Sequence, residues 1–198
     1  MLDSTRPIGN PTNSDLGRPK ITSAGVLWSW YALRATYSRE LKVQAHLNAL
    51  GVRTFVPMMW KRIEKEGREI KKLVPAVSNL CFVYWTKQDI DEYIRGFGGN
   101  SPVKYYWDRT AGHALTVPEK AMENFIKVAS TMDEDIIYIT QITSKLQEGQ
   151  TVKVKDGPFK GVEGKIVRIR KSRRILVELP GMLAVATTYV APEDLEII

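Results

Sequence analysis

The sequence is poor in cysteine and has no long apolar run. Cys81 is the single cysteine among 198 residues, which excludes an internal disulfide framework and a cysteine-rich metal site within one chain. No stretch approaches the roughly 18 apolar residues that a membrane-spanning helix needs, and the N-terminus lacks the basic start and apolar core of a secretory signal. These absences predict a cytoplasmic protein without a membrane partner.

Residue patterns typical of catalysis are missing as well. The two histidines, His46 and His113, have no metal-ligand spacing between them, and there is no Walker-type glycine loop. Cys81 lies in an apolar stretch, where a small core residue is the expected role. We therefore expect a protein that is not an enzyme and that holds no metal or cofactor.

Charge is weighted toward the basic side. The 29 Lys and Arg residues against 22 Asp and Glu residues give a formal net charge of +7. This excess favours an anionic neighbour such as nucleic acid, although it names no function by itself. With 43% apolar residues, the chain can build one medium or two small hydrophobic cores.

Composition divides the chain into four segments. Residues 1–23 are polar and punctuated by proline and glycine, which predicts a disordered tail. Residues 24–135 show strand and helix patterns in turn, residues 136–147 are predicted as a linker, and residues 148–198 carry short apolar runs separated by glycine turns. We expect two domains, of which the second is a small β-barrel.

The first domain is predicted to be α+β. Strands are expected at residues 25–35, 54–59, 80–85 and 103–107, helices at residues 39–50 and 87–95, and a charged hairpin with its tip at residues 66–67. A third helix should begin at Pro118 and place Met122, Phe125, Ala129 and Met132 on one stripe. This order suggests an antiparallel sheet with flanking helices.

Residues 152–166, VKVKDGPFKGVEGKI, resemble a KOW motif, which implies a small all-β, SH3-like barrel. Asp156 and Gly157 supply a tight turn, and Gly161 and Gly164 permit a positive φ or a close approach of two backbones. An unrelated SH3-like barrel is the plainer alternative for this segment.

A second resemblance lies in the first domain. Residues 30–35, WYALRA, and residues 75–83, PAVSNLCFV, are similar to the N-terminal domain of the NusG family, the NGN domain. Asn79 stands where a left-handed turn is expected, and asparagine tolerates that conformation. Asn79 and the short span of residues 51–57 further resemble specialised antiterminators of the RfaH and UpxY type.

The resemblance implies a transcription elongation and antitermination factor that binds the RNA polymerase elongation complex and serves particular operons. It also implies an apolar surface for the clamp helices of the polymerase β′ subunit, built from Trp30, Tyr31, Val77, Leu80 and Phe82. For Trp30 and Phe82, a place in the core of the sheet is an equal alternative, because strand residues alternate between faces.

Two further surfaces follow from the same resemblance, and the protein is expected to be a monomer. The non-template DNA strand would lie against Arg34, Tyr37, Arg39 and Lys42, held by phosphate attraction and stacking. A plain solvated helix face is the alternative there. In the barrel, a NusE-type ribosomal protein or the Rho terminator would contact Leu179, Met182, Arg170 and Arg173.

A function of a different class remains open. A ribosome-associated KOW protein would bind structured RNA through the basic residues at positions 168–174. The aromatic platforms expected of an RNA binder are not obvious in the sequence. Loss of polymerase binding on substitution of Tyr31 and Val77 would be expected only for the elongation factor.

Overall fold

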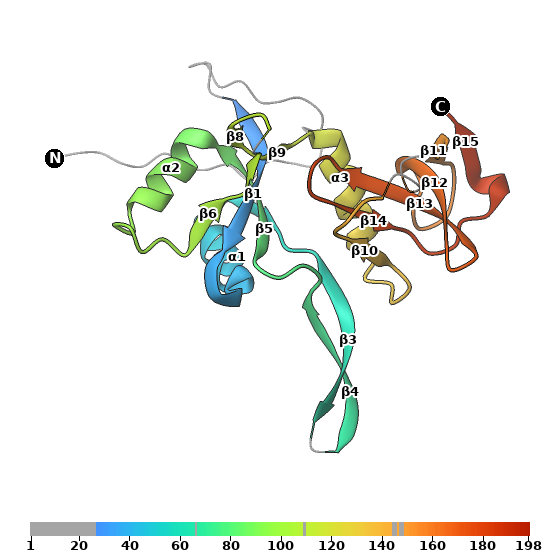
Figure 1. Cartoon of the computed structure of the whole chain (residues 1–198), viewed down its shortest axis with the longest axis horizontal. Coiled ribbons are helices and arrows are strands. Elements are labelled where there is room, and N and C mark those ends of the chain that lie inside the picture. The colour runs from blue at the N-terminus through green and yellow to red at the C-terminus, as the bar shows by residue number, and fades with distance from the viewer. Residues whose placement is uncertain (1–26, 66, 109, 144–145, 147–148) are drawn as a thin grey trace.

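The computed structural model of the chain consists of two units, and the last helix of the first unit lies between their two cores (Figure 1). The structure describes residues 27–198 except for residues 66, 109, 144–145 and 147–148, so the tail predicted for residues 1–23 lies outside the described residues. The first unit comprises residues 27–129 and the second unit comprises residues 137–198. A hairpin extends from the first unit, away from both cores (Figure 1).

An antiparallel sheet forms the centre of the first unit, as predicted. Strand β1 (Trp28–Ala35) pairs with β5 (Leu80–Thr86) on one side, and with β6 (Val103–Tyr105) and β9 (Thr116–Val117) on the other. Strand β2 (Arg53–Phe55) pairs with β5 and completes the five-stranded sheet. Alternation of side chains along β1 and β5 supplies both faces of this sheet with apolar residues.

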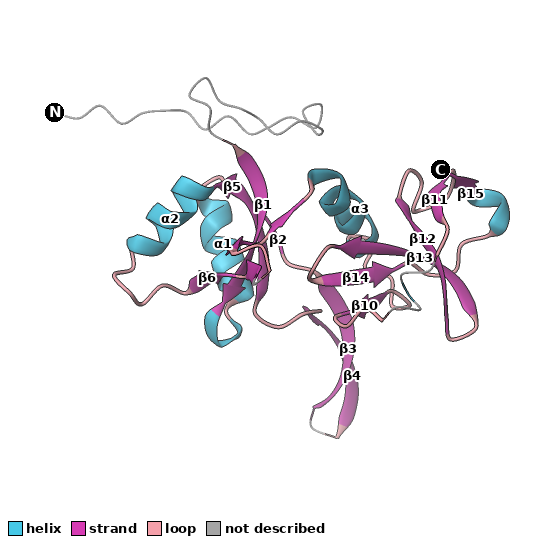
Figure 2. Ribbon diagram, turned by 45° about the horizontal axis from the view of Figure 1, so that its top comes forward, coloured by secondary structure: helices cyan, strands magenta, loops and turns pink. Residues whose placement is uncertain are grey.

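Each face of the sheet has its own helices (Figure 2). Helices α1 (Glu40–Ala49) and α2 (Lys87–Arg95) cover the face that carries Leu33 and Val83. Helix α3 (Glu119–Ala129) covers the opposite face, where the Phe125 ring lies edge-on to Phe82 with centroids 5.9 Å apart. The α+β arrangement of sheet and flanking helices is therefore confirmed for this unit.

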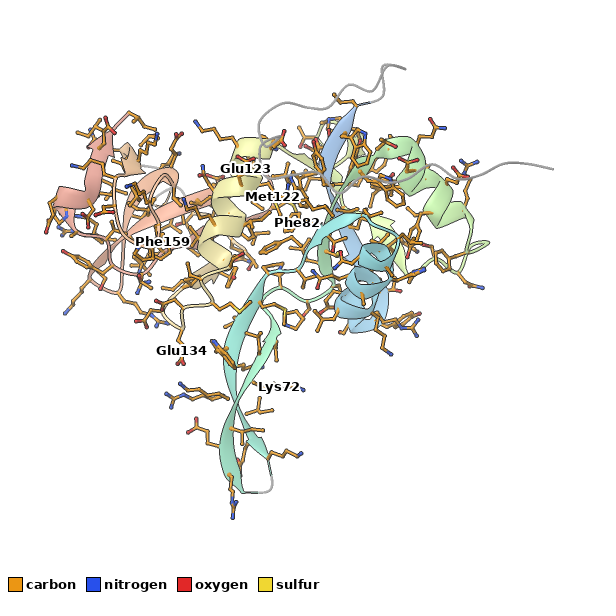
Figure 3. All side chains as sticks on the ribbon, turned by 180° about the vertical axis from the view of Figure 1, so that it is seen from behind. Lys72, Phe82, Met122, Glu123, Glu134 and Phe159 are labelled. Atoms are coloured by element: carbon orange, nitrogen blue, oxygen red, sulfur yellow. The ribbon has the colours of Figure 1, made fainter. Side chains whose placement is uncertain are left out.

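Helix α3 is apolar on more than one side. Met122, Phe125 and Ala129 are buried as predicted, but Val128 is buried too, because α3 also packs against the second unit. Figure 3 shows Met122 of α3 between Phe82 of the first unit and Phe159 of the second. The prediction for Met132 is wrong: the helix ends at Ala129, and Met132 is 43% exposed with a φ of 51°.

The predicted hairpin is formed by β3 (Met58–Lys65) and β4 (Arg68–Pro75). Lys65 pairs with Arg68 as the last pair of the hairpin, and of the tip predicted at residues 66–67, residue 66 lies outside the described residues. A second, short hairpin joins β7 (Trp107–Asp108) to β8 (His113–Ala114).

The second unit is all-β, as predicted. Its six-stranded antiparallel sheet has the order β10-β14-β13-β12-β11-β15. The strands are β10 (Ile137–Ile139), β11 (Thr151–Val154), β12 (Glu163–Ile169), β13 (Ser172–Leu179), β14 (Leu183–Ala186) and β15 (Leu195–Ile197), with a 3-10 turn at Pro192–Asp194. Strand β10 lies in the predicted linker and pairs with β14, so that stretch belongs to the sheet rather than to a free connection.

Polar contacts join the units in addition to the shared core. The Lys120 ammonium on α3 lies 2.5 Å from the Glu163 carboxylate on β12, and Lys127 donates to the carbonyl of Lys160. The Tyr138 hydroxyl on β10 donates to the carbonyl of Met58, 3.1 Å away. The two units therefore pack on each other in this structure.

Candidate functional site

An open cavity of about 510 Å³ lies where the two units meet. The first unit contributes one wall and the loop between β13 and β14 contributes the other. The wall residues are mainly apolar, with Thr140 between the units; they are Val77, Leu80, Tyr106, Trp107, Leu115, Gly181, Met182 and Leu183, joined by Asp108 and Thr110 at the rim. Such a concave apolar surface is typical of a binding site for an apolar partner.

Four of the five residues predicted to bind polymerase belong to the sheet face that carries this cavity. Val77 is half-buried and Leu80 is 1% exposed, and both line the cavity. Trp30 and Phe82 lie deeper, at 1% and 0% exposure, beneath α3 and neighbouring side chains. Of the two alternatives left open for Trp30 and Phe82, the structure shows the place in the core, because α3 covers this part of the sheet.

Tyr31 lies on the opposite face. It follows Trp30 in β1, so its side chain points toward the cluster that includes α1 and α2, where its ring meets Tyr105 with centroids 5.9 Å apart. Burial raises the pKa of the Tyr31 phenol. A single surface that contains Tyr31 together with Val77 and Leu80 is therefore not present in the structure.

Tyr106 and Leu115 complete the wall of the first unit, and sequence reasoning did not include them. The Leu115 amide donates to the Tyr106 carbonyl, and the Leu115 carbonyl accepts from the Ala32 amide, which fixes both residues beside β1. Tyr106 lies in the strand expected at residues 103–107, where the sequence does not say which neighbour it faces, and Leu115 comes from a segment too short to show a strand or helix period. Burial raises the pKa of the Tyr106 phenol, and the charge of Arg34 opposes that rise.

The loop predicted as the partner surface of the second unit faces this cavity. Leu179 is fully buried, whereas Met182 is half-buried and lines the cavity. Gly181 has a φ of 74°, and a side chain built there would approach the Leu115 Cδ1 atom to 3.8 Å. Val77 and Leu80 of the first unit and Met182 of the second, which were predicted to bind different partners, therefore line the same cavity.

Three of the four predicted nucleic-acid-binding residues gather at the start of α1. Tyr37, in the 3-10 turn Thr36–Ser38, has a φ of 56° and is 85% exposed, and the Arg39 guanidinium lies 5.5 Å from its ring centroid. Arg39 and Lys42 line the same shallow pocket. Asn79 has a φ of 62°, as its predicted left-handed turn requires, and its side chain accepts from the Ser38 amide at 2.8 Å.

Arg34 is exposed at the far end of β1, on the face that carries Trp30 and the cavity rather than beside α1. In the second unit, Arg170 and Lys171 form the two-residue turn between β12 and β13, and Arg168 stands directly opposite Arg173. Arg170 and Arg173 are thus close to each other but belong to a different part of the second unit from Leu179 and Met182.

Clusters typical of metal sites are not seen in the described ranges: no group of three or more His, Cys, Asp or Glu side chains is arranged to hold an ion. Within the same ranges, no helix has the length and apolarity needed to cross a bilayer.

An α+β unit and an all-β unit that meet at an apolar cavity define a two-unit interaction protein. The family of transcription termination factor NusG matches residues 28–126, and the KOW motif matches residues 148–178. The chain belongs to the NusG family, whose members are non-catalytic transcription factors that bind RNA polymerase.

No curated protein matches the chain. One similar solved structure comes from work on domain interaction in Thermotoga maritima NusG; it is 22% identical, covers 86% of this chain and 97% of that chain, and has a TM-score of 0.43.

Proposed function

We propose that the protein is an operon-specific elongation factor that binds the RNA polymerase elongation complex and suppresses pausing or termination. Membership of the NusG family supports the general role. The observation that carries the proposal is the apolar cavity wall of Val77, Leu80, Tyr106 and Leu115. An amphipathic helix pair such as the β′ clamp helices is a suitable occupant for an apolar groove of this kind.

The exposed ring of Tyr37 supports contact with the non-template DNA strand. A left-handed backbone at Tyr37 and at Ser38 is unfavourable for side chains of this size, and strain of this kind is often retained at functional sites. The ring is held outward beside Arg39, so it offers a stacking surface next to a cation. We place this contact, and the protein, in the cytoplasm with the transcription machinery.

A partner of the second unit would compete with the first unit. Leu179 is fully buried and Met182 lines the cavity between the units, so we expect a NusE-type ribosomal protein or Rho to reach these two side chains only after the units separate. The proposed order is polymerase binding first, followed by recruitment of the second partner.

Co-elution of the full chain with a reconstituted elongation complex tests the polymerase site. Val77→Asp places a charge on the cavity wall and should weaken binding by about 2 kcal/mol, or roughly thirtyfold. Leu50→Asp is the matched control, because Leu50 is 45% exposed at the end of α1 and lies outside the cavity. Equal binding by wild type and Val77→Asp would contradict the proposal.

A ribosome-associated RNA-binding role is the second candidate, and the basic turn at Arg170 and Lys171 favours it. The same experiment separates the two functions. If neither wild type nor Leu50→Asp binds the elongation complex, while the wild type binds structured ribosomal RNA, the second candidate replaces the first.

A further inference from the structure

Strand β10, which connects the two units, has one face toward each of two apolar clusters. Ile136 and Tyr138 point into the core that α3 shares with both units, where the Tyr138 ring lies 6.3 Å from that of Phe125. Ile137 and Ile139 point the other way and pack against a small cluster of buried residues that all belong to the second unit. Apolar contacts alone therefore do not decide which unit the strand follows when the units separate.

Backbone pairing holds β10 to the second unit. The strand pairs with β14 from Ile137 opposite Ala186 to Ile139 opposite Ala184, and Figures 1 and 2 show it along the edge of that strand. Toward the first unit, the Tyr138 hydroxyl donates to the Met58 carbonyl. A strand ladder joins several backbone groups at once, so it is harder to break than one hydrogen bond from a side chain.

Arg174 on β13 adds a buried contact at the start of β10. The side chain is 8% exposed, and its Nη1 atom donates to the carbonyl of Asp135 at 2.6 Å and to that of Thr187 at 2.7 Å. Thr187 is itself fixed within the second unit, because it is fully buried and its hydroxyl accepts from the Ile175 amide. The guanidinium therefore ties Asp135 to the second unit.

Burial of the Arg174 cation destabilises the fold unless the cation has a role. Its buried Nε atom has no hydrogen-bond partner, and Arg174 takes part in none of the ion pairs among the described residues. Removing such a charge from water without a carboxylate partner is unfavourable. An apolar side chain would fill the position without that penalty, but it would not hold the Asp135 carbonyl. The contact to Asp135 is thus the role that the structure assigns to the arginine.

On the other side, α3 holds the chain as far as Met132. The Met132 amide donates to the Ala129 carbonyl, and a φ of 51° at Met132 turns the chain away from the helix. Glu134 lies 2.6 Å from Lys71 of the hairpin, but both side chains are half-exposed, and exposed ion pairs add little stability. From Asp135 onward, the contacts of the second unit take over.

We propose that Arg174 and β10 make residues 135–142 part of the second unit, and that the units separate about a joint at residues 132–134. The inference rests on the proposed function for the reason to open, but not for the position of the joint. The joint spans at most about 14 Å between Thr131 and Asp135, whereas a free linker as far as residue 147 would span about 60 Å. The second unit therefore stays close to the first after opening, and its partner is bound within that short reach.

Amide hydrogen exchange of the full chain, measured by NMR without polymerase, tests which unit holds residues 137–139. Arg174→Met removes the contact to the second unit and keeps an apolar side chain. Tyr138→Phe removes the hydrogen bond to the first unit. Arg168→Met is the matched control, because Arg168 is exposed on the neighbouring strand β12 and its replacement removes the same charge.

Arg174→Met should speed exchange at residues 137–139 by about tenfold relative to β11 and β12, because a hydrogen bond from a charged donor is lost. Tyr138→Phe and Arg168→Met should stay within about threefold of the wild type, since β10 remains paired with β14 in both. Arg174→Lys keeps a cation and a donor at this position, so it should release β10 less than Arg174→Met does.

Three outcomes would overturn the proposal. Faster exchange at residues 137–139 in Tyr138→Phe, without a change in Arg174→Met, would assign β10 to the first unit and move the joint beyond it. An equal increase throughout β10–β15 in both Arg174 variants would show that the arginine stabilises the second unit as a whole. Unchanged exchange in every variant would show that Arg174 does not hold β10. Failure to bind the elongation complex would contradict the proposed function but would leave the joint in place.

Discussion

Arg170 and Lys171 occupy a two-residue turn whose backbone disfavours their side chains. Their φ values are 50° and 65°, between the paired residues Ile169 and Ser172. Hairpin turns of this type favour Asn-Gly, and a left-handed conformation costs other residues roughly 1–2 kcal/mol each. Arg170→Asn/Lys171→Gly should therefore raise the free energy of unfolding by about 1–2 kcal/mol, measured by urea denaturation.

A matched variant separates backbone strain from charge repulsion at this turn. Arg170→Gln/Lys171→Gln removes the same two charges but keeps side chains that disfavour the left-handed region. We expect little gain in stability from this variant. An equal gain in the free energy of unfolding in both variants would show that the turn is destabilised by charge repulsion among Arg168, Arg170 and the neighbouring cations, and not by the positive φ values.

Cys81 is predicted to be unreactive in the folded protein. Its side chain is fully buried, and burial, aided by the charge of Glu40, raises the pKa of the thiol from 9.0 to about 12. At pH 8 the thiolate fraction falls about a thousandfold relative to an unperturbed thiol, so alkylation by iodoacetamide should be slower than in the denatured chain by at least that factor. A comparable rate for folded and denatured protein would contradict this burial.

The same raised pKa predicts a pH dependence of stability. The contribution of the Cys81 thiol to the free energy of unfolding is fully present at pH values below about 9, the pKa of the thiol in the unfolded chain. Between pH 9 and about pH 12, the thiol is deprotonated in the unfolded chain but still protonated in the folded protein. The contribution to the free energy of unfolding therefore declines as pH rises, by up to about 1.4 kcal/mol per pH unit. Cys81→Ala should lack this component when urea midpoints are compared across that range.

Single residues differ in how far the sequence determines their place. The left-handed turn at Asn79 and the positive φ of Gly161 were predicted from residue type, and Gly164 lies where a side chain would collide with the Leu176 carbonyl. The sheet faces of Trp30 and Tyr31 could not be assigned, because both sides of β1 are apolar and alternation alone does not say which side α3 will cover.

At the scale of elements, local patterns predicted most of the fold. The helix periods around α2 and α3, the apolar run of β5 and the tip of the charged hairpin all come from residues close in sequence. Residues 136–142 are rich in β-formers, but β10 pairs with β14, which is far away in the chain, so the local pattern did not show that residues 137–139 join the sheet of the second unit. Burial of Val128 on a second side of α3 has the same origin.

The candidate site was predictable only in part, for a related reason. Val77 and Leu80 stand in the stretch of residues 75–83 that resembles the NusG family. Tyr106 and Leu115 are instead held at the cavity by backbone hydrogen bonds between short segments. Apolar residues in such segments carry no period that marks them as surface or core. Met182 and Leu183 line the cavity only because the two units pack on each other, and the sequence pattern of either unit alone does not predict that packing.

At the scale of the whole molecule, the packed arrangement hides the surfaces that the proposed function needs. Val77 and Leu80 on the first unit share a cavity with Met182 on the second, and the loop at Gly181 approaches Leu115. A partner that binds only the separated units must also supply the free energy of separation, which lowers its apparent affinity by the fraction of molecules that are open. The proposed polymerase binding is therefore coupled to opening.

Charges on the two walls of the cavity should have opposite effects on polymerase binding. Met182→Asp and Val77→Asp each introduce a carboxylate into an apolar contact, and both destabilise the closed arrangement. Met182→Asp leaves the wall of the first unit intact, so binding to the elongation complex should tighten by about tenfold for each 1.4 kcal/mol of destabilisation. Val77→Asp damages that wall and should lose affinity despite opening.

Small-angle scattering supplies the structural control for this pair, because opening increases the radius of gyration in both variants while affinity moves in opposite directions. If both variants open and both lose affinity, the Met182 side of the cavity is itself part of the polymerase site. If Met182→Asp opens the molecule without any change in affinity, the closed arrangement does not limit binding, and the cavity wall on the first unit is accessible to polymerase while the units remain packed.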